Sequence, residues 1–519
     1  MGSNLAKRKD DLSLFFCRTG SIIIFILLGL NTTASGQDPM GIFEQHGDIG
    51  DCKLDGNMEY EPDSQTYVLE GSGENMWFDK DQFHFVWKKL DGDFIIRARI
   101  EFIGKGVNAH RKAGLMIRSS LGTDVPHVNG VVHGDGLTSI QFRREKGAVT
   151  EEIKSGARAP EILQLERRGK EYILSTAHIG EPFDTVTFSG LDLGEEIYAG
   201  LFICSHDNNV LEKARFANVR IILPAGEDLI PYEDYLGSNL EILDLETGIR
   251  KVIYQSPKSL QAPNWSADGK YLVYNSEGLL YRFDLESGIP EVIPSGFATS
   301  NNNDHVISFD GRTLGISNHE EEAGGRSIIY IMPISGGTPE RITADGPSYL
   351  HGWSPDGEYL TFTGQRNGQF DIYKISVNDK VEIRLTDTPG LDDGPEYSPD
   401  GRYIYFNSNR TGLMKIWRMH PDGSDQQQLT FGEYNDWFPH ISPDGDWMVF
   451  LSFQNDVRSD DHPFYKQVYL RRLHLGKLEA SGVKPEVIAY VYGGQGTINV
   501  PSWSPDSKRI AFVSNTGMK

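Results

Sequence analysis

One four-residue turn recurs through the C-terminal half of the sequence and constrains the fold more than any other feature. The turn is Ser-Pro-Asp-Gly or a close variant, and a short apolar segment follows it each time. The six turns begin at Ser266, Ser308, Ser354, Ser398, Ser442 and Ser504. The first four intervals between them are 42 to 46 residues long and the last is 62. Self-similarity at such a period predicts stacked supersecondary units.

Each repeat unit has the pattern of four short β-strands. One strand leads into the turn, where Pro presets φ and Gly accepts a positive φ. In the third unit, strand-like segments follow at 359–364, 371–377 and 383–387. Four-stranded units arranged radially are the blades of a β-propeller.

The two ends of the repeat region determine the number of blades. The last unit, residues 501–517, has only two strand-like segments, whereas residues 239–256 have the two that it lacks. We therefore predict that 239–256 pairs with the C-terminal half-blade and closes a six-bladed propeller over residues 238–519. A closed ring leaves no unpaired strand edge to template aggregation.

The preceding region is also all-β. In residues 92–102, apolar and polar side chains alternate, which is typical of a strand buried on one face. Similar segments recur to residue 222, and residues 223–237, rich in Pro and acidic residues, are typical of an interdomain linker. The fold class predicted is all-β, with an N-terminal jelly-roll β-sandwich (37–222) before the propeller.

Several polar side chains alternate with the core positions of these sandwich strands. If the strands adjoin, one sheet surface could hold a sugar or a partner; the alternative is a solvated face with cross-strand charge pairs. The residues are Arg97, Arg99, Glu101, Arg118, Gln141, Arg143, Gln164 and Glu166.

The N-terminus has the pattern of a signal peptide over residues 1–36. Basic residues precede an apolar core at 21–30, and small residues follow it. We expect an exported protein, periplasmic or secreted, without a stable membrane span after cleavage; an uncleaved anchor is the alternative. The net charge of −23 argues against nucleic acid as a partner. Whether Cys52 and Cys204 form a disulfide stays open.

Two family resemblances add to these patterns. Residues 48–51, 67–77, 81–94, 112–120 and 199–209 resemble a concanavalin A-like, laminin-G-like domain of bacterial exported proteins. That resemblance implies a jelly-roll sandwich and carbohydrate binding. The repeats resemble the TolB-like (PD40) propeller repeat, which specifies the fold far more than the function. TolB pairs its propeller with an α/β domain, so the sandwich argues against a Tol-Pal role. No GxSxG motif supports serine hydrolysis.

Candidate ligand residues lie where the innermost strands begin, because propellers bind ligands at the mouth of the central channel. Three positions before the turn serine, four blades have Pro, whereas two adjacent blades have His305 and His351. The full set predicted to face the funnel is His305, His351, Asp393, Glu396, Asp436, Trp437, His440, Gln495 and Asn499.

These residues admit two interpretations. They could form a polar ligand pocket, with Trp437 stacking on a sugar, or they could satisfy backbone groups and channel water. A divalent metal held by His305, His351 and His440 is a further hypothesis, since imidazole suits such ions. The insertion at 454–467, with Asp460, Asp461 and His462, could form a lid or a solvated loop.

The function expected is an exported TolB-like binding or scaffold protein. Its funnel and sandwich face would recognise a glycan, a peptide or an envelope partner without catalysis, and no catalytic residue is predicted. The alternative is a metal-assisted, lyase-like carbohydrate-active enzyme, by loose analogy with oligogalacturonate lyases, which are metal-binding propeller enzymes.

Overall fold

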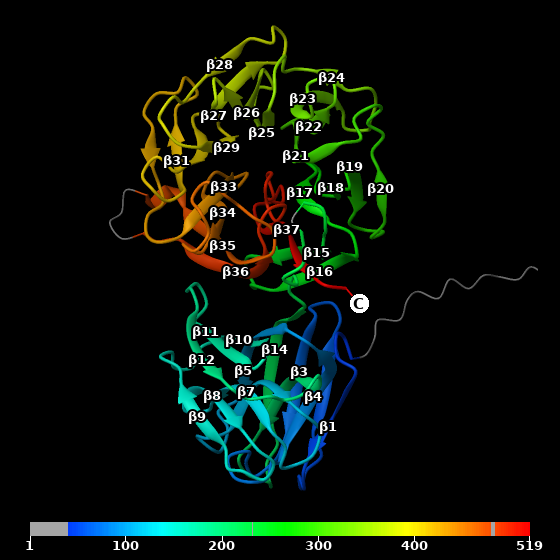
Figure 1. Cartoon of the computed structure of the whole chain (residues 1–519), viewed down its shortest axis with the longest axis vertical. Helices are drawn as coiled ribbons and strands as arrows, with labels where there is room; N and C mark the ends of the chain where they lie inside the picture. Colours follow the sequence, from blue (N-terminus) through cyan, green and yellow to red (C-terminus); the bar gives the residue numbers. More distant parts are fainter. Residues whose placement is uncertain (1–39, 231, 479–482, 519) are drawn as a thin grey trace, which may run out of the picture. The chain divides into compact units, whose positions relative to one another are not determined.

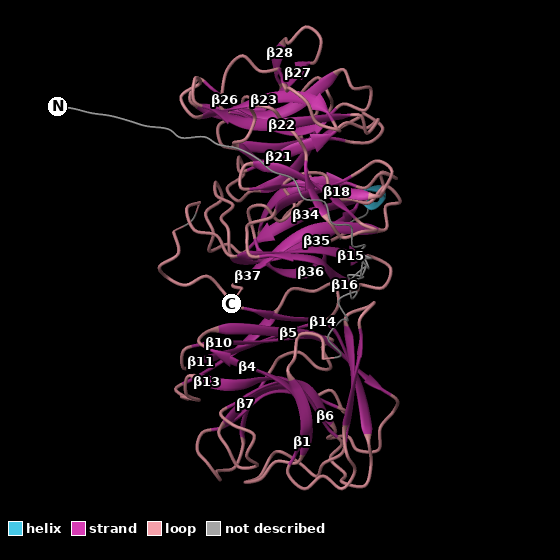
Figure 2. Ribbon diagram, turned by 90° about the vertical axis from the view of Figure 1, so that its right-hand side faces the viewer, coloured by secondary structure: helices cyan, strands magenta, loops and turns pink. Residues whose placement is uncertain are grey.

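The computed structural model describes residues 40–230, 232–478 and 483–518. The predicted signal peptide lies outside these residues. Strands make up nearly all the regular structure of the described chain (Figure 2), and its one helix is the 3₁₀ turn η1 (Leu475–Lys477). Among the described residues, no helix has the length and apolarity needed to span a membrane.

The N-terminal region is a sandwich of two seven-stranded antiparallel sheets. The first sheet has the order β1 (Gln45–Ile49), β4 (Phe83–Asp91), β13 (Glu196–Cys204), β6 (Lys112–Arg118), β7 (His127–His133), β8 (Thr138–Arg143) and β9 (Glu151–Lys154). The second has the order β12 (Asp184–Ser189), β11 (Glu171–Ala177), β10 (Ile162–Arg168), β5 (Phe94–Ile103), β14 (Glu212–Ile222), β3 (Thr66–Gly71) and β2 (Asn57–Glu61).

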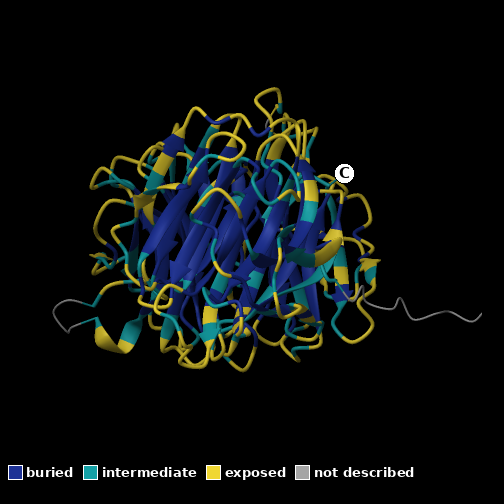
Figure 3. Cartoon of the chain, turned by 90° about the horizontal axis from the view of Figure 1, so that it is seen from below, coloured by how far each residue is buried: buried dark blue, intermediate teal, exposed yellow. Residues whose placement is uncertain are grey.

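The alternation seen in the sequence produces the sandwich core. Phe94, Ile96 and Ala98 of β5 point inward and pack in one cluster with Leu115 and Ile117 of β6. Burial of these side chains drives the two sheets together. Figure 3 shows buried strands bordered by exposed loops. The predicted sandwich is confirmed, whereas its concanavalin A-like identity stays a prediction. Cys52 and Cys204 are free thiols.

The polar side chains proposed to share one sandwich surface do not do so. Arg97 on β5 pairs across the sheet with Gln164 on β10, but Arg118 and Arg143 lie on β6 and β8 of the other sheet. The condition that all these strands adjoin is therefore wrong. Arg118 and Arg143 are instead fully buried, and both bind the buried carboxylate of Asp81.

The C-terminal region is a six-bladed β-propeller (Figure 1), as predicted. Five blades are four-stranded antiparallel sheets, written here from the innermost strand outward. The first two are β17 (Gln261–Trp265), β18 (Tyr271–Ser276), β19 (Leu279–Asp284) and β20 (Pro290–Val292), then β21 (Asn301–Ile307), β22 (Thr313–Glu320), β23 (Arg326–Pro333) and β24 (Glu340–Arg341).

The next three blades follow in chain order. They are β25 (Ser348–Trp353), β26 (Tyr359–Arg366), β27 (Gln369–Ser376) and β28 (Glu382–Arg384); β29 (Asp392–Tyr397), β30 (Ile404–Ser408), β31 (Lys415–Met419) and β32 (Gln427–Gln428); and β33 (Asn435–Ile441), β34 (Trp447–Phe453), β35 (Lys466–His474) and β36 (Glu486–Gly493).

The sixth blade joins the two ends of the propeller. β15 (Gly237–Asp244) pairs antiparallel with β37 (Arg509–Thr516) over eight residue pairs, and β16 (Arg250–Ser256) pairs with β15 on its other side. A bridge between Trp503 and Ile510 supplies the innermost position. The first and last segments of the ring thus share one sheet, which leaves no open edge between them.

The recurring turn stabilises the end of each innermost strand by the same contacts. In the third blade the Ser354 hydroxyl donates to Asp356 and accepts a hydrogen bond from the backbone N–H of Tyr359, at 2.8 Å. Gly357 follows with a φ of +75°, which favours glycine. The turn is therefore structural, and the opposite ends of the innermost strands are free to form a site.

Candidate functional site

A pocket of about 1190 Å³ lies where the innermost strands begin. Every blade contributes to its wall, which places it at the mouth of the central channel. One residue from each blade illustrates this, namely Gln261, Asp304, His351, Asp393, Phe438 and Asn499. A pocket of this volume can hold a ligand larger than a drug-sized molecule.

The innermost strands are not regular at the point where they meet this pocket. In five blades the pairing with the second strand shifts, by one residue in four of them, as between Asp393 and Glu396 on β29, and by two residues between Asn301 and His305 on β21. Such a bulge rotates the side chains that precede it. On β21, Asp304 lies within the shift and lines the pocket, whereas His305, which pairs with Ile316 beyond the shift, does not.

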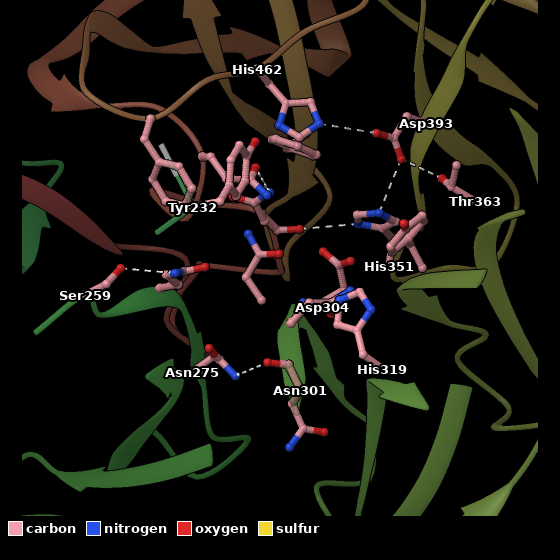
Figure 4. Close-up of a pocket in the computed structure, with 18 of the residues that line it drawn as sticks. Tyr232, Ser259, Asn275, Asn301, Asp304, His319, His351, Thr363, Asp393 and His462 are labelled. Carbon is pink, nitrogen blue, oxygen red and sulfur yellow. Dashed lines mark hydrogen bonds and ion pairs between the residues drawn. The ribbon is translucent and has the colours of Figure 1, made fainter. Parts of the chain in front are cut away.

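A network of carboxylates and imidazoles lies in the wall of the pocket (Figure 4). His351 Nε2 is 3.3 Å from Asp393 Oδ1, and His351 Nδ1 is 3.4 Å from the carbonyl oxygen of Asn499. Asp393 also accepts hydrogen bonds from the Thr363 hydroxyl, at 2.6 Å, and from its neighbour's backbone N–H. His462 Nε2 is 4.0 Å from Asp393 Oδ2. Both His351 nitrogens face acceptors, so the ring is held as an imidazolium.

The protonation of this network follows from burial and charge. Burial opposes charging of Asp393, but the hydrogen bond and charge of His351 outweigh it and lower the pKa of Asp393 to about 2. Burial likewise opposes the charged form of His351, but Asp304 and Asp393 raise its pKa above the ordinary value. Burial raises the pKa of Asp304 to about 7 because His351 offsets only part of the cost.

Amide and aromatic side chains make up much of the remaining wall. The amides include Asn275, Asn301, Asn302, Asn303, Gln495 and Asn499. Asn303 Nδ2 is buried without a hydrogen-bond partner among the described residues. The aromatic rings of Tyr349 and Phe370 lie 6.3 Å apart on one side. Amides can donate and accept hydrogen bonds, and rings offer apolar faces, so this wall suits a polar ligand with both kinds of surface.

The linker and the long insertion cover part of the pocket. Tyr232 and Tyr235 of the linker line it together with Asp460, His462 and Phe464 of the insertion. The Phe464 ring lies edge-on to both tyrosines, 5.2 Å from Tyr232 and 5.8 Å from Tyr235. The insertion, for which the sequence left open a lid or a solvated loop, contributes to the pocket wall, although Asp461 is not among the lining residues.

Of the nine residues predicted to face the funnel, four line the pocket: His351, Asp393, Gln495 and Asn499. The other five, His305, Glu396, Asp436, Trp437 and His440, are buried in the blades around it.

Four of these five side chains have hydrogen-bond partners within the blades. His440 Nδ1 is 2.6 Å from Glu396 Oε2, and His440 Nε2 bonds the carbonyl oxygen of Ile498. Asp436 accepts a hydrogen bond from Ser452, at 2.7 Å. Trp437 is wholly enclosed in a core cluster. Their roles as ligand-binding residues stay predictions.

Each of the three histidines proposed as metal ligands lies against a backbone carbonyl oxygen. His305 Nε2 lies 3.2 Å from the carbonyl oxygen of Val273, and burial lowers the pKa of His305 to about 4. Within the described ranges, no three His, Cys, Asp or Glu side chains are grouped as a metal site requires. The metal hypothesis gains no support from this geometry.

Sequence reasoning missed most of the pocket wall, including Asp304, Tyr349 and Tyr232. Counting back from the turn serine selected His305 and passed over Asp304, one residue earlier. Tyr232 lies in a segment whose composition indicated only a linker. The run Asn301–Asn303 before Asp304 was the one visible signal, since three consecutive amides are unusual at a strand entry.

Fold and site together define a six-bladed propeller with a ligand-sized polar pocket at its mouth. A family model described as TolB beta propeller domain matches residues 350–463. An uncharacterized protein of Agrobacterium fabrum is 50% identical over 277 residues, which are 53% of this chain and 92% of that protein. The chain therefore belongs to the family of TolB-like β-propeller proteins.

Two further relatives delimit the similarity. A solved structure from Agrobacterium tumefaciens, described as a TolB, is 47% identical with a TM-score of 0.52, and the match covers 55% of this chain and all of that one. The Tol-Pal system protein TolB of Francisella tularensis is 28% identical over 131 residues, which are 25% of this chain and 30% of that protein. The similarity to TolB of the Tol-Pal system is thus confined to part of each chain.

Proposed function

We propose that this chain is an exported binding protein whose propeller funnel holds a glycan without converting it. The observation that carries the proposal is the pocket itself, in which amide side chains from several blades adjoin aromatic rings. Hydroxyl groups of a sugar can both donate to and accept from amides, and the C–H face of a sugar ring can pack on Tyr349 or Phe370. The buried, unpartnered Asn303 Nδ2 would gain an acceptor.

Charge and the N-terminal sequence support the rest of the proposal. A net charge of −23 disfavours anionic polymers as ligands, because they would be repelled before contact. Export rests on the signal-peptide pattern of residues 1–36. Tyr232 of the linker and Phe464 of the insertion would exclude water from the bound ligand.

Titration calorimetry of the purified protein with a panel of soluble oligosaccharides tests the proposal. We expect at least one to bind and Tyr349→Ala to weaken it about tenfold, since loss of a ring contact costs about 1.4 kcal/mol. Tyr403→Ala is the matched control, because Tyr403 is partly exposed and lies outside the funnel wall. Equal losses in both variants would contradict the proposal. Chemical change of the bound oligosaccharide would refute its non-catalytic part.

A further inference from the structure

Asp304 is the one lining carboxylate of the funnel without a bonded partner in the described parts of the chain. Its side chain is 6% exposed and lines the pocket. Its backbone N–H bonds the Asn302 side chain, but no hydrogen bond or ion pair among the described residues ends on its carboxylate oxygens. A buried carboxylate without a partner is costly, and it gains stability from a proton or from a cation.

The other charged groups of the pocket are already compensated. Asp393 is bonded to His351, to Thr363 and to a backbone N–H. Glu277 pairs with Lys258, and Asp460 pairs with Arg458 through two hydrogen bonds.

When Asp304, His351 and Asp393 are all ionised, one negative charge remains among the three. His351 is directed at Asp393 and at a backbone carbonyl, so both of its N–H donors are occupied, and neither is left for Asp304 (Figure 4).

We propose that Asp304 is the binding residue for a protonated amine of the ligand, so that the glycan is one with free amino groups. This inference rests on the proposed function of the funnel. The amine would form a charge-assisted hydrogen bond with the Asp304 carboxylate, and neighbouring hydroxyls would meet the amides of Asn302 and Asn303. The raised pKa of Asp304 agrees with a carboxyl group that stays protonated until a cation replaces the proton.

A neutral sugar lacks this advantage. Its hydroxyls can only donate to a carboxylate that is already costly to ionise, whereas an ammonium group supplies both the hydrogen bond and the missing charge. An N-acetylated amine has the same position on the sugar ring but no charge. The pair of free and acetylated amino sugars therefore isolates the electrostatic contribution.

The test compares a glucosamine tetramer with an N-acetylglucosamine tetramer by calorimetry on the full chain at pH 6.5. We expect the free amine to bind at least tenfold more tightly, as a hydrogen bond to a charged group implies. In Asp304→Asn the two affinities should become equal within about twofold. Asp460→Asn removes the same charge from the same pocket but from a carboxylate paired with Arg458, so it should keep the preference.

The possible results distinguish a failure of amine recognition by Asp304 from a failure of glycan binding by the funnel. Equal binding of both tetramers by the unmodified protein would overturn the inference and leave glycan binding intact. A preference that survives Asp304→Asn would also overturn it, because the charge recognised would lie elsewhere. If neither tetramer binds but trilysine does, the inferred glycan class is wrong. If Asp304→Asn lowers the unfolding temperature, Asp304→Ser serves as the second variant. The comparison of the two tetramers on the unmodified protein needs no variant and still tests the inference.

Discussion

Replacing Asp81 by Asn would destabilise the sandwich at a point where two buried arginines share one carboxylate. Asp81, Arg118 and Arg143 are all 0% exposed. Arg143 binds both oxygens of Asp81, at 2.7 and 3.0 Å, and Arg118 binds one at 3.3 Å. The amide of Asn keeps the shape but not the charge, so two buried guanidinium groups would lose their counter-ion.

The expected loss follows from the burial of these groups. Removing one partner of a buried ion pair typically costs about 3–5 kcal/mol, because the remaining charge is stranded in a medium that solvates it poorly. The arginines retain backbone carbonyl acceptors, such as Ser120 and Ala148, so the lower end of that range is expected. At about 1.36 kcal/mol per tenfold change, 3 kcal/mol corresponds to roughly a 150-fold rise in local opening.

Hydrogen exchange followed by mass spectrometry of the full chain measures this opening locally. Amides of β6 and β8 should exchange about 150-fold faster in Asp81→Asn, while propeller amides serve as an internal reference. Asp79→Asn is the matched control, because Asp79 lies in the same loop but is exposed. If exchange in β6 changes by less than threefold relative to this control, the burial argument is refuted.

Two other predictions concern the propeller. His305 is buried with a pKa of about 4 against 6.5 for the ordinary group, so the folded state binds fewer protons and loses stability as pH falls from 7 toward 4. Between pH 7 and pH 5 this lowers the free energy of unfolding by about 2 kcal/mol. In denaturant titrations at the two pH values, His305→Gln should therefore lose about 2 kcal/mol less than the unmodified protein. If both lose the same amount, His305 is not the source of the loss. Phe512→Ala on the closing strand should cost about 3–5 kcal/mol and speed exchange in β15, whereas Phe309→Ala, at a 46% exposed site, should have little effect.

Much of the architecture could be predicted because it depends on local chemistry repeated many times. Each turn serine bonds the aspartate two residues later, at 2.5 to 2.7 Å, and this contact involves only neighbours in the sequence. Counting the strands at the two ends then predicted that residues 239–256 complete the last blade, and β15 pairs with β37 accordingly.

The candidate site was harder to predict from the sequence than the fold, because in five blades a strand bulge lies between the turn and the mouth of the funnel. Counting back three residues from each turn serine selects the same position in every blade, but the register shift does not fall at the same position in every blade. On β21 it lies before His305, between Asn301 and His305. His305 therefore lies in the regular part of the strand and inside the blades, whereas Asp304 lies within the shift and lines the pocket. His351 was identified correctly as a pocket residue because the bulge on β25 lies between Leu350 and Gly352, next to it.

The sequence by itself determined the repeating unit, the number of blades and the two-part organisation, since turn chemistry and alternation act between near neighbours. Only the tertiary structure decided which side chains share the funnel. Asp304, His351 and Asp393 lie on three different strands, and Tyr232 comes from a linker with no pattern of its own. Their proximity depends on strand bulges and loop paths, which are set by packing across the whole ring and not by any local signal.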